Sequence, residues 1–200
     1  MFITFEGGEG TGKTTLIKRI YQSLKKDYDV LLTREPGGSP IAEIIRDVVL
    51  NPKNKGITAR TEALLIAASR TQHLDDMILP ALAQNQIVLC DRYLDSSLAY
   101  QAVARDLGFD FVLNINQYAT KHMPDLTFYI DLEPEVGISR ITKRKKYDRL
   151  DQETLDYHHL VRKGYLKVAK MYEKRIIVID GTQSLDDIYA IMMKHIYQKL

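Results

Sequence analysis

The chain contains a single cysteine, no long apolar run and almost no excess of charge of either sign. Cys90 cannot form an internal disulfide, and its place in an apolar run predicts a small buried strand residue in a reducing compartment. No apolar run approaches the length of a membrane span, and no basic, apolar leader precedes the first predicted strand, so we expect a cytoplasmic protein without a membrane partner. With 28 Lys and Arg against 26 Asp and Glu, the net charge of +2 does not favour a nucleic-acid partner.

Residues 7–15 match the pattern G-x-x-x-x-G-K-[ST] of a phosphate loop that binds a nucleoside triphosphate. The β-branched and aromatic run 2–5 precedes them, and apolar residues at helical spacing follow over 16–24, which is the strand, loop and helix order that the motif needs. Glycines let backbone N–H groups point at phosphate oxygens, assisted by the helix dipole. The alternative is a glycine-rich turn without a ligand. The predicted ATP-binding residues are Gly7, Gly8, Glu9, Gly10, Thr11, Gly12, Lys13, Thr14 and Thr15. Lys13 is expected to reach the β- and γ-phosphates, and the Thr14 hydroxyl to hold Mg²⁺.

Five short runs typical of strands alternate with segments of helical apolar spacing, and no repeat, low-complexity tract or linker interrupts them. The runs are 2–5, 30–33, 87–90, 126–130 and 176–179. Together with the phosphate loop, this alternation predicts one α/β domain over 1–200, a three-layer P-loop NTPase fold with a five-stranded parallel sheet flanked by helices. We expect a helix from about residue 58 or 61 to Leu79, ending before Pro80, and further helices over 94–104, 107–122 and 152–172.

Arginines gather at the predicted strand ends and on the helices beside them. Ligands bind beyond the carboxyl ends of parallel strands, and Arg34, Arg46, Arg70 and Arg92 supply more cationic charge there than a triphosphate needs. Guanidinium groups suit bidentate phosphate recognition, so a second, phosphorylated substrate is predicted. Taken singly, each arginine is equally consistent with a structural or surface role.

Two carboxylates and one histidine share this region. Asp91 ends the apolar third strand and suits the Mg²⁺ shell, and the alternative is a helix cap or an ion pair with Arg92. Glu35 could contact Mg²⁺ through water or fix Arg34, or it could form a salt bridge alone. His73 shares a helix face with Ile66 and Arg70 and is interpreted as a packing residue, because no carboxylate or nucleophile accompanies it in the sequence.

Seven segments give the chain a resemblance to bacterial thymidylate kinases along essentially its whole length. They are residues 5–15, 33–38, 67–70, 91–93, 96–101, 124–127 and 148–151. The resemblance implies transfer of the γ-phosphate of ATP to dTMP, with Mg²⁺, in a homodimer. The acceptor-site roles that it implies are Arg46 and Arg92 on the dTMP phosphate, Arg70 and Gln101 on the thymine edge, Glu9 near the 3′-hydroxyl, Tyr100 on the sugar side, and Ser97 beside them.

The densest basic run of the chain, from Arg140 to Arg149, predicts a mobile basic lid at about 138–150. The four variable positions of the phosphate loop contain no Lys or Arg, so we expect the lid to supply the transition-state cation, with Arg144 and Arg149 as the candidates. A solvated basic face is the alternative. After the last strand, the resemblance places adenine near Gln183, where a turn and a helix cap are the alternative. Ile66 stands where close relatives carry an aromatic residue that stacks on thymine.

Two other functions share parts of this pattern. A deoxynucleoside kinase would use Glu35 as a general base toward a 5′-hydroxyl, but the surplus of arginines favours a phosphorylated acceptor. A P-loop ATPase or GTPase switch would hydrolyse nucleotide to drive a conformational change. The sequence contains no guanine-reading N-K-x-D-like motif, so a GTPase is not favoured.

Overall fold

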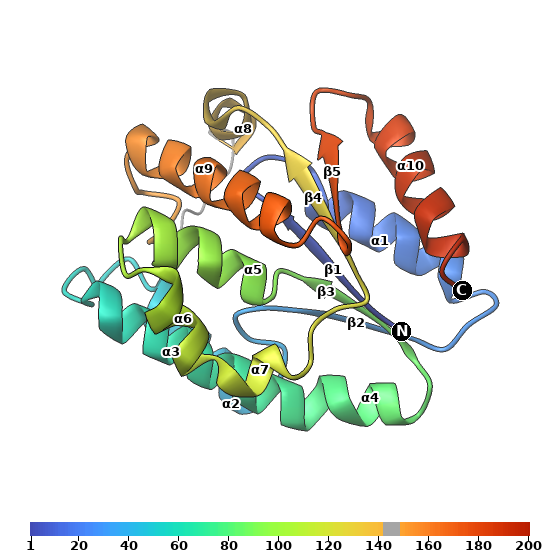
Figure 1. Cartoon of the computed structure of the whole chain (residues 1–200), viewed down its shortest axis with the longest axis horizontal. Helices are drawn as coiled ribbons and strands as arrows, with labels where there is room; N and C mark the ends of the chain where they lie inside the picture. Colours follow the sequence, from blue (N-terminus) through green and yellow to red (C-terminus); the bar gives the residue numbers. More distant parts are fainter. Residues whose placement is uncertain (142–148) are drawn as a thin grey trace.

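The computed structural model describes residues 1–141 and 149–200 and contains a five-stranded parallel sheet (Figure 1). The strands are β1 (Phe2–Gly7), β2 (Val30–Arg34), β3 (Ile87–Asp91), β4 (Leu126–Asp131) and β5 (Ile176–Asp180), in the order β2-β3-β1-β4-β5. Every neighbouring pair is parallel. The predicted fold class is therefore confirmed, and each predicted strand is present within two residues of its expected bounds.

Helices cover both faces of the sheet because side chains of the central strand alternate between two apolar clusters. Ile3 and Phe5 of β1 pack with α1 (Lys13–Leu24) and α10 (Leu185–Tyr197), which lie side by side in Figure 1. Phe2 faces the other side, toward α4 (Leu79–Ala83) and α5 (Leu94–Ser97). That second side also carries α9 (Leu155–Met171), which packs on β4 through Tyr129 and Tyr165. The three layers are helices, sheet and helices.

The remaining helices lie in the connections between these strands. They are α2 (Pro40–Leu50), α3 (Ala59–His73), α6 (Phe109–Ile115), α7 (Gln117–Thr120) and α8 (Pro134–Ile141). Strand register aligns the ends that form the site, because Asp91 of β3 lies opposite both Phe5 of β1 and Arg34 of β2. Among the described residues, no helix has the length and apolar character needed to cross a membrane.

The sequence predicts a helix that ends at Leu79, before Pro80, but in the structure the helix continues past this proline. A π-helical turn over Leu74–Ile78 follows α3, and α4 then continues to Ala83 with Pro80 in its first turn. Proline is tolerated there because the N–H it lacks would have no partner within the new helix. The wider turn thus restarts the helix and keeps the chain direction, which a periodicity argument cannot foresee.

The two helices predicted over 94–104 and 107–122 are also divided. The first is α5 followed by a π-helical stretch over Leu98–Ala104, and the second is α6 and α7 with a break at Asn116. The side chain of Asn116 donates to the carbonyl of Val112 at 2.8 Å and accepts from Arg70 at 2.6 Å. The second helix is therefore interrupted at the residue whose side chain accepts a hydrogen bond from the buried Arg70.

Candidate active site

The phosphate loop joins β1 to α1 as the sequence predicted. Gly10 and Gly12 adopt φ values of 67° and 85°, a left-handed conformation that favours glycine. The first turn of α8 packs directly on this loop, since a Cβ on Gly10 would lie 2.0 Å from the carbonyl oxygen of Gly137. The Nη1 of Arg140, near the end of α8, donates to the carbonyl of Gly10 at 3.2 Å. A side chain at Gly10 or at Gly137 would therefore displace the loop.

Lys13 is held inside the loop that it serves. Its Nζ donates to the carbonyl oxygens of Gly7 and Gly8 at 2.9 and 3.1 Å, and the residue is 7% exposed. Burial lowers the pKa of the Lys13 ammonium, and the nearby charge of Arg92 lowers it further. A ligand that brings negative charge into the loop would favour the charged form, which suits a phosphate site.

Thr14 and Asp91 meet at the edge of the loop cavity. The Thr14 hydroxyl donates to Oδ2 of Asp91 at 3.3 Å, and both residues line a cavity of about 150 Å³ with the phosphate loop. Oδ1 of Asp91 is buried and has no hydrogen-bond partner among the described residues. A hydroxyl beside an acceptor-only carboxylate with an unused oxygen is a donor set that Mg²⁺ accepts.

Arg92 forms the wall between this cavity and a second one. Its backbone is left-handed, with a φ of 71°, and its guanidinium donates to Glu9 Oε1 at 2.7 Å and to the Tyr165 hydroxyl at 2.8 Å. Glu6 of β1 binds two residues next to Arg92. It accepts from the backbone N–H of Tyr93 at 2.8 Å and from the Tyr165 hydroxyl at 2.9 Å. Burial, together with the charge of Asp95, raises the pKa of the Glu6 carboxyl to about 7. The backbone N–H of Arg92 donates to the carbonyl of Phe5 at 3.0 Å, so neighbours hold Arg92 at both its backbone and its side chain.

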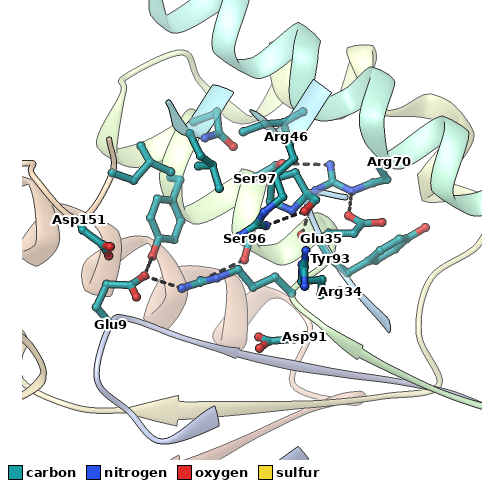
Figure 2. A pocket seen from close by; sticks show the side chains of 17 residues that line it. Glu9, Arg34, Glu35, Arg46, Arg70, Asp91, Tyr93, Ser96, Ser97 and Asp151 are labelled. Carbon is teal, nitrogen blue, oxygen red and sulfur yellow. Dashed lines mark hydrogen bonds and ion pairs between the residues drawn. The ribbon is translucent and has the colours of Figure 1, made fainter. Parts of the chain in front are cut away.

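The second cavity, of about 220 Å³, is the larger of the two and contains the predicted arginine cluster (Figure 2). In Figure 2, Glu9 and Asp151 lie on one side of the cavity, and Arg70 with Glu35 lies on the opposite side. The predicted acceptor residues that line it are Glu9, Arg34, Arg46, Ile66, Arg70, Arg92, Ser97, Tyr100 and Gln101. Glu9, Asp91 and Arg92 line both cavities, which therefore adjoin.

Glu35 has partners other than the expected Arg34. Its Oε2 accepts from Nε of Arg70 at 2.6 Å, and its Oε1 lies 3.2 Å from Nδ1 of His73. Arg34 instead pairs with Glu43 at 2.9 Å, so the expectation that Glu35 fixes Arg34 is wrong. Successive residues at a strand end point to opposite sides, which separates the two side chains. His73 is fully buried, as a packing residue should be, but a carboxylate accompanies it in space.

The thymidylate kinase family model matches residues 5–190 of the chain. The chain belongs to the thymidylate kinase family. It is 59% identical to the thymidylate kinase of Acholeplasma laidlawii (strain PG-8A) over the whole of both chains. It is 50% identical to the thymidylate kinase of Geobacillus sp. (strain WCH70), covering all of this chain and 97% of the other. Among solved structures, it resembles the thymidylate kinase from Ehrlichia chaffeensis with a TM-score of 0.82 and 30% identity, over 98% of each chain.

Three residues predicted for a thymidylate kinase site lie apart from the cavities or outside the described chain. Arg144 lies outside the described residues. Arg149 lies at the ends of α2 and α3, where it donates to Glu62 at 2.6 Å and to the carbonyl of Val49 at 2.8 Å. Gln183 follows the Asp180 turn, in which Asp180 accepts from the N–H of Thr182 at 2.9 Å. The transition-state role of Arg149 and the adenine role of Gln183 stay predictions.

Sequence reasoning missed four residues that support the site, namely Glu6, Glu62, Arg140 and Tyr165. Tyr165 occupies an apolar position of α9 between Val161 and Val168, so its spacing predicts only core packing. Glu62 lies one turn from Ile66 on α3, but nothing in the sequence shows which residues approach it. Arg140 belongs to the predicted basic lid, but nothing in the sequence shows that it reaches Gly10. In each case the partner that reveals the role lies far away in the sequence.

Ile66 and Arg70 both line the second cavity, which we call the acceptor cavity because it contains the predicted acceptor residues. Ile66 is 6% exposed and lies against the space in which a base could bind. We expect Ile66→Phe to tighten dTMP binding several-fold with little change in ATP affinity, because base–aromatic stacking contributes about 1–3 kcal/mol while isoleucine retains part of this through desolvation. Calorimetric titration of dTMP and ATP into both proteins measures the effect. A fall in melting temperature with unchanged dTMP affinity would mean that the ring only overpacks α3, at a cost of roughly 1–3 kcal/mol.

Proposed function

We propose that this protein phosphorylates dTMP to dTDP, with ATP as the phosphoryl donor and Mg²⁺ as the metal. The observation that carries the proposal is the pair of adjoining cavities that share Arg92, Asp91 and Glu9 as a wall. One contains the phosphate loop, and the other contains a set of arginines suited to a monophosphate. Two anionic substrates bound in these cavities would meet at Arg92.

The residues at the shared wall support direct phosphoryl transfer. An acceptor phosphate oxygen is already anionic, so the reaction needs positioning and charge neutralisation rather than a strong general base. Arg92 faces both cavities and is the residue best placed to hold the acceptor phosphate against the donor. Lys13 would neutralise the β- and γ-phosphates from the opposite side. Arg46, which donates to the carbonyl of Pro36 at 2.6 Å, is the second proposed phosphate ligand.

The Thr14 hydroxyl and the Asp91 carboxylate are oxygen ligands that suit Mg²⁺. When bound, the ion would neutralise charge on the triphosphate and orient its terminal phosphate. Asp91 offers Oδ1, which has no partner among the described residues, and Thr14 offers its hydroxyl. Both Glu35 oxygens already have partners in Arg70 and His73, so we leave Glu35 out of the proposed inner shell.

A transition-state cation from the basic segment remains part of the proposal. Arg140 donates to the carbonyl of Gly10 in the phosphate loop, so the first residues of this basic segment lie beside the loop. Arg144 follows Arg140 closely in the sequence and is the residue we propose for this role. Arg149 would first have to leave Glu62, which makes it the weaker candidate.

Thymidine should not be phosphorylated, whereas dTMP should be. The reason is that Arg46 and Arg92 would each contribute about 1.5–3 kcal/mol to binding through a charge-assisted contact with the phosphate that thymidine lacks. An ADP-release assay with ATP, Mg²⁺ and a panel of nucleosides and monophosphates measures this. Equal turnover of thymidine and dTMP would favour a deoxynucleoside kinase, and rapid ADP release without any acceptor would favour an ATPase.

We also propose that the protein is a cytoplasmic homodimer. Helix α2 leaves Ile41, Ile44 and Val48 exposed, and Leu64 of the neighbouring α3 is exposed as well. An exposed apolar group of this kind on adjacent helices suits a partner copy. Light scattering during size-exclusion chromatography decides between one and two copies.

A further inference from the structure

Glu62 of α3 is a buried carboxylate to which the proposed reaction gives no role. It is 1% exposed, and three residues from two separate segments donate to it. Gln101 Nε2 donates to Oε1 at 2.9 Å, and Arg149 and Arg105 donate to Oε2 at 2.6 and 3.1 Å. A carboxylate is seldom buried without such partners, so the cluster accounts for its burial.

The Glu62 carboxylate remains ionised in this cluster. Burial alone would raise its pKa, but the hydrogen bond from Arg149 and the charge of Arg105 outweigh burial, and the pKa lies below its ordinary value. An ionised carboxylate can only accept hydrogen bonds. It therefore selects the NH₂ group of the Gln101 amide and turns the amide oxygen away from α3.

Gln101 lines the acceptor cavity beside Ile66 and Arg70, and it is 2% exposed. With its NH₂ nitrogen held at Glu62, the Gln101 amide cannot turn over, so the acceptor that it can present to a ligand in the cavity is fixed as its oxygen. The N3 position of thymine or uracil is a donor, whereas N3 of cytosine is an acceptor. An acceptor fixed on the wall of a buried site favours the first and rejects the second.

We propose that Glu62 sets the base selectivity of the acceptor site by fixing the Gln101 amide with its oxygen toward the base. The proposal rests on the proposed function, in which the base lies against Gln101. Glu62 is then a positioning residue that acts through Gln101 and does not touch the substrate.

A purely structural role for Glu62 predicts a different result. As a simple anchor between α3, Arg105 and Arg149, it would affect stability and the turnover of every nucleotide alike. As an orienting group, it changes the ratio of kcat/KM values between bases. The dUMP to dCMP ratio is the informative one, because these acceptors differ only at position 4 and N3 of the base.

We expect Glu62→Gln to lower the dUMP to dCMP ratio of kcat/KM roughly tenfold, because an amide at position 62 can donate as well as accept and lets Gln101 turn its NH₂ group toward N3 of cytosine. The matched control is Glu153→Gln. Glu153 accepts from the same Nη2 of Arg105 as Glu62 does and lies outside the acceptor cavity, so its replacement should leave the ratio unchanged. Melting curves establish that each variant is folded.

The exchange Glu62→Gln with Gln101→Glu supplies a rescue. The donor and the acceptor-only group change places, so residue 62 donates to residue 101, whose second oxygen again faces the base. The ratio should return toward that of the unmodified protein. If the single variant does not fold, this double variant decides alone, and a folded double variant without discrimination would overturn the proposal.

The remaining outcomes separate this proposal from the function on which it rests. A folded Glu62→Gln protein that keeps the original ratio overturns the role of Glu62 and leaves dTMP phosphorylation intact. An unmodified protein that turns over dUMP and dCMP equally would show that Gln101 does not read the base, and it would count against the proposed acceptor site itself.

Discussion

Replacement of Arg92 by alanine is expected to lower kcat/KM for dTMP by about 10–10², because a charge-assisted contact of about 1.5–3 kcal/mol with the dTMP phosphate is lost. The guanidinium faces both cavities and is held by Glu9 and the Tyr165 hydroxyl. Its backbone has a φ of 71°, a conformation that costs free energy in a residue other than glycine. Strain maintained by Glu6 and Tyr165 at this position is consistent with a functional requirement.

Steady-state kinetics with dTMP and ATP varied separately measure this prediction. The KM for ATP should change far less than kcat/KM for dTMP, since the phosphate loop and Lys13 remain. The control is Arg19→Ala, which removes a half-exposed arginine paired with Asp186 on the outer surface. A fall of less than tenfold at Arg92 would mean that other arginines hold the acceptor phosphate.

Lys13→Ala should lower kcat by about 10²–10³, the range seen when one preorganised group that stabilises transition-state charge is removed. In the structure, the Lys13 ammonium donates to the carbonyl oxygens of Gly7 and Gly8, 2.9 and 3.1 Å away. Phosphate oxygens would replace these two acceptors when ATP binds. Lys13 is 7% exposed, so its ammonium lies inside the loop.

Single-turnover kinetics separate the chemical step from ATP binding for this variant. Lys18→Ala is a matched control, because Lys18 lies on the same helix and is exposed. Binding of dTMP, measured by calorimetry, should be unchanged in both variants. Wild-type kcat in the Lys13 variant would rule out the proposed role of the ammonium in neutralising the triphosphate.

Arg70 and Arg34 show how far sequence reasoning could go at this site. Both were predicted to line an acceptor pocket, and both do. Their partners could not be foreseen, because Arg70 reaches Glu35 across 35 residues of sequence and also binds Asn116 where two helices separate. Burial also differs sharply, since the Arg70 side chain is 1% exposed and that of Arg34 is 54% exposed. Arg70 is therefore rigidly placed, whereas Arg34 is largely solvated.

The sequence by itself determined the phosphate loop, the five parallel strands and the edge of the sheet at which the arginines collect. These features depend on periodicity, glycine conformation and the order of neighbouring segments, which are all local. Only the tertiary structure decided that Arg92 lies between two cavities, that Tyr165 holds it and that Glu62 meets Gln101. Those contacts join residues 39 to 83 positions apart, and they exist because buried charges must find partners wherever the packed layers bring them together.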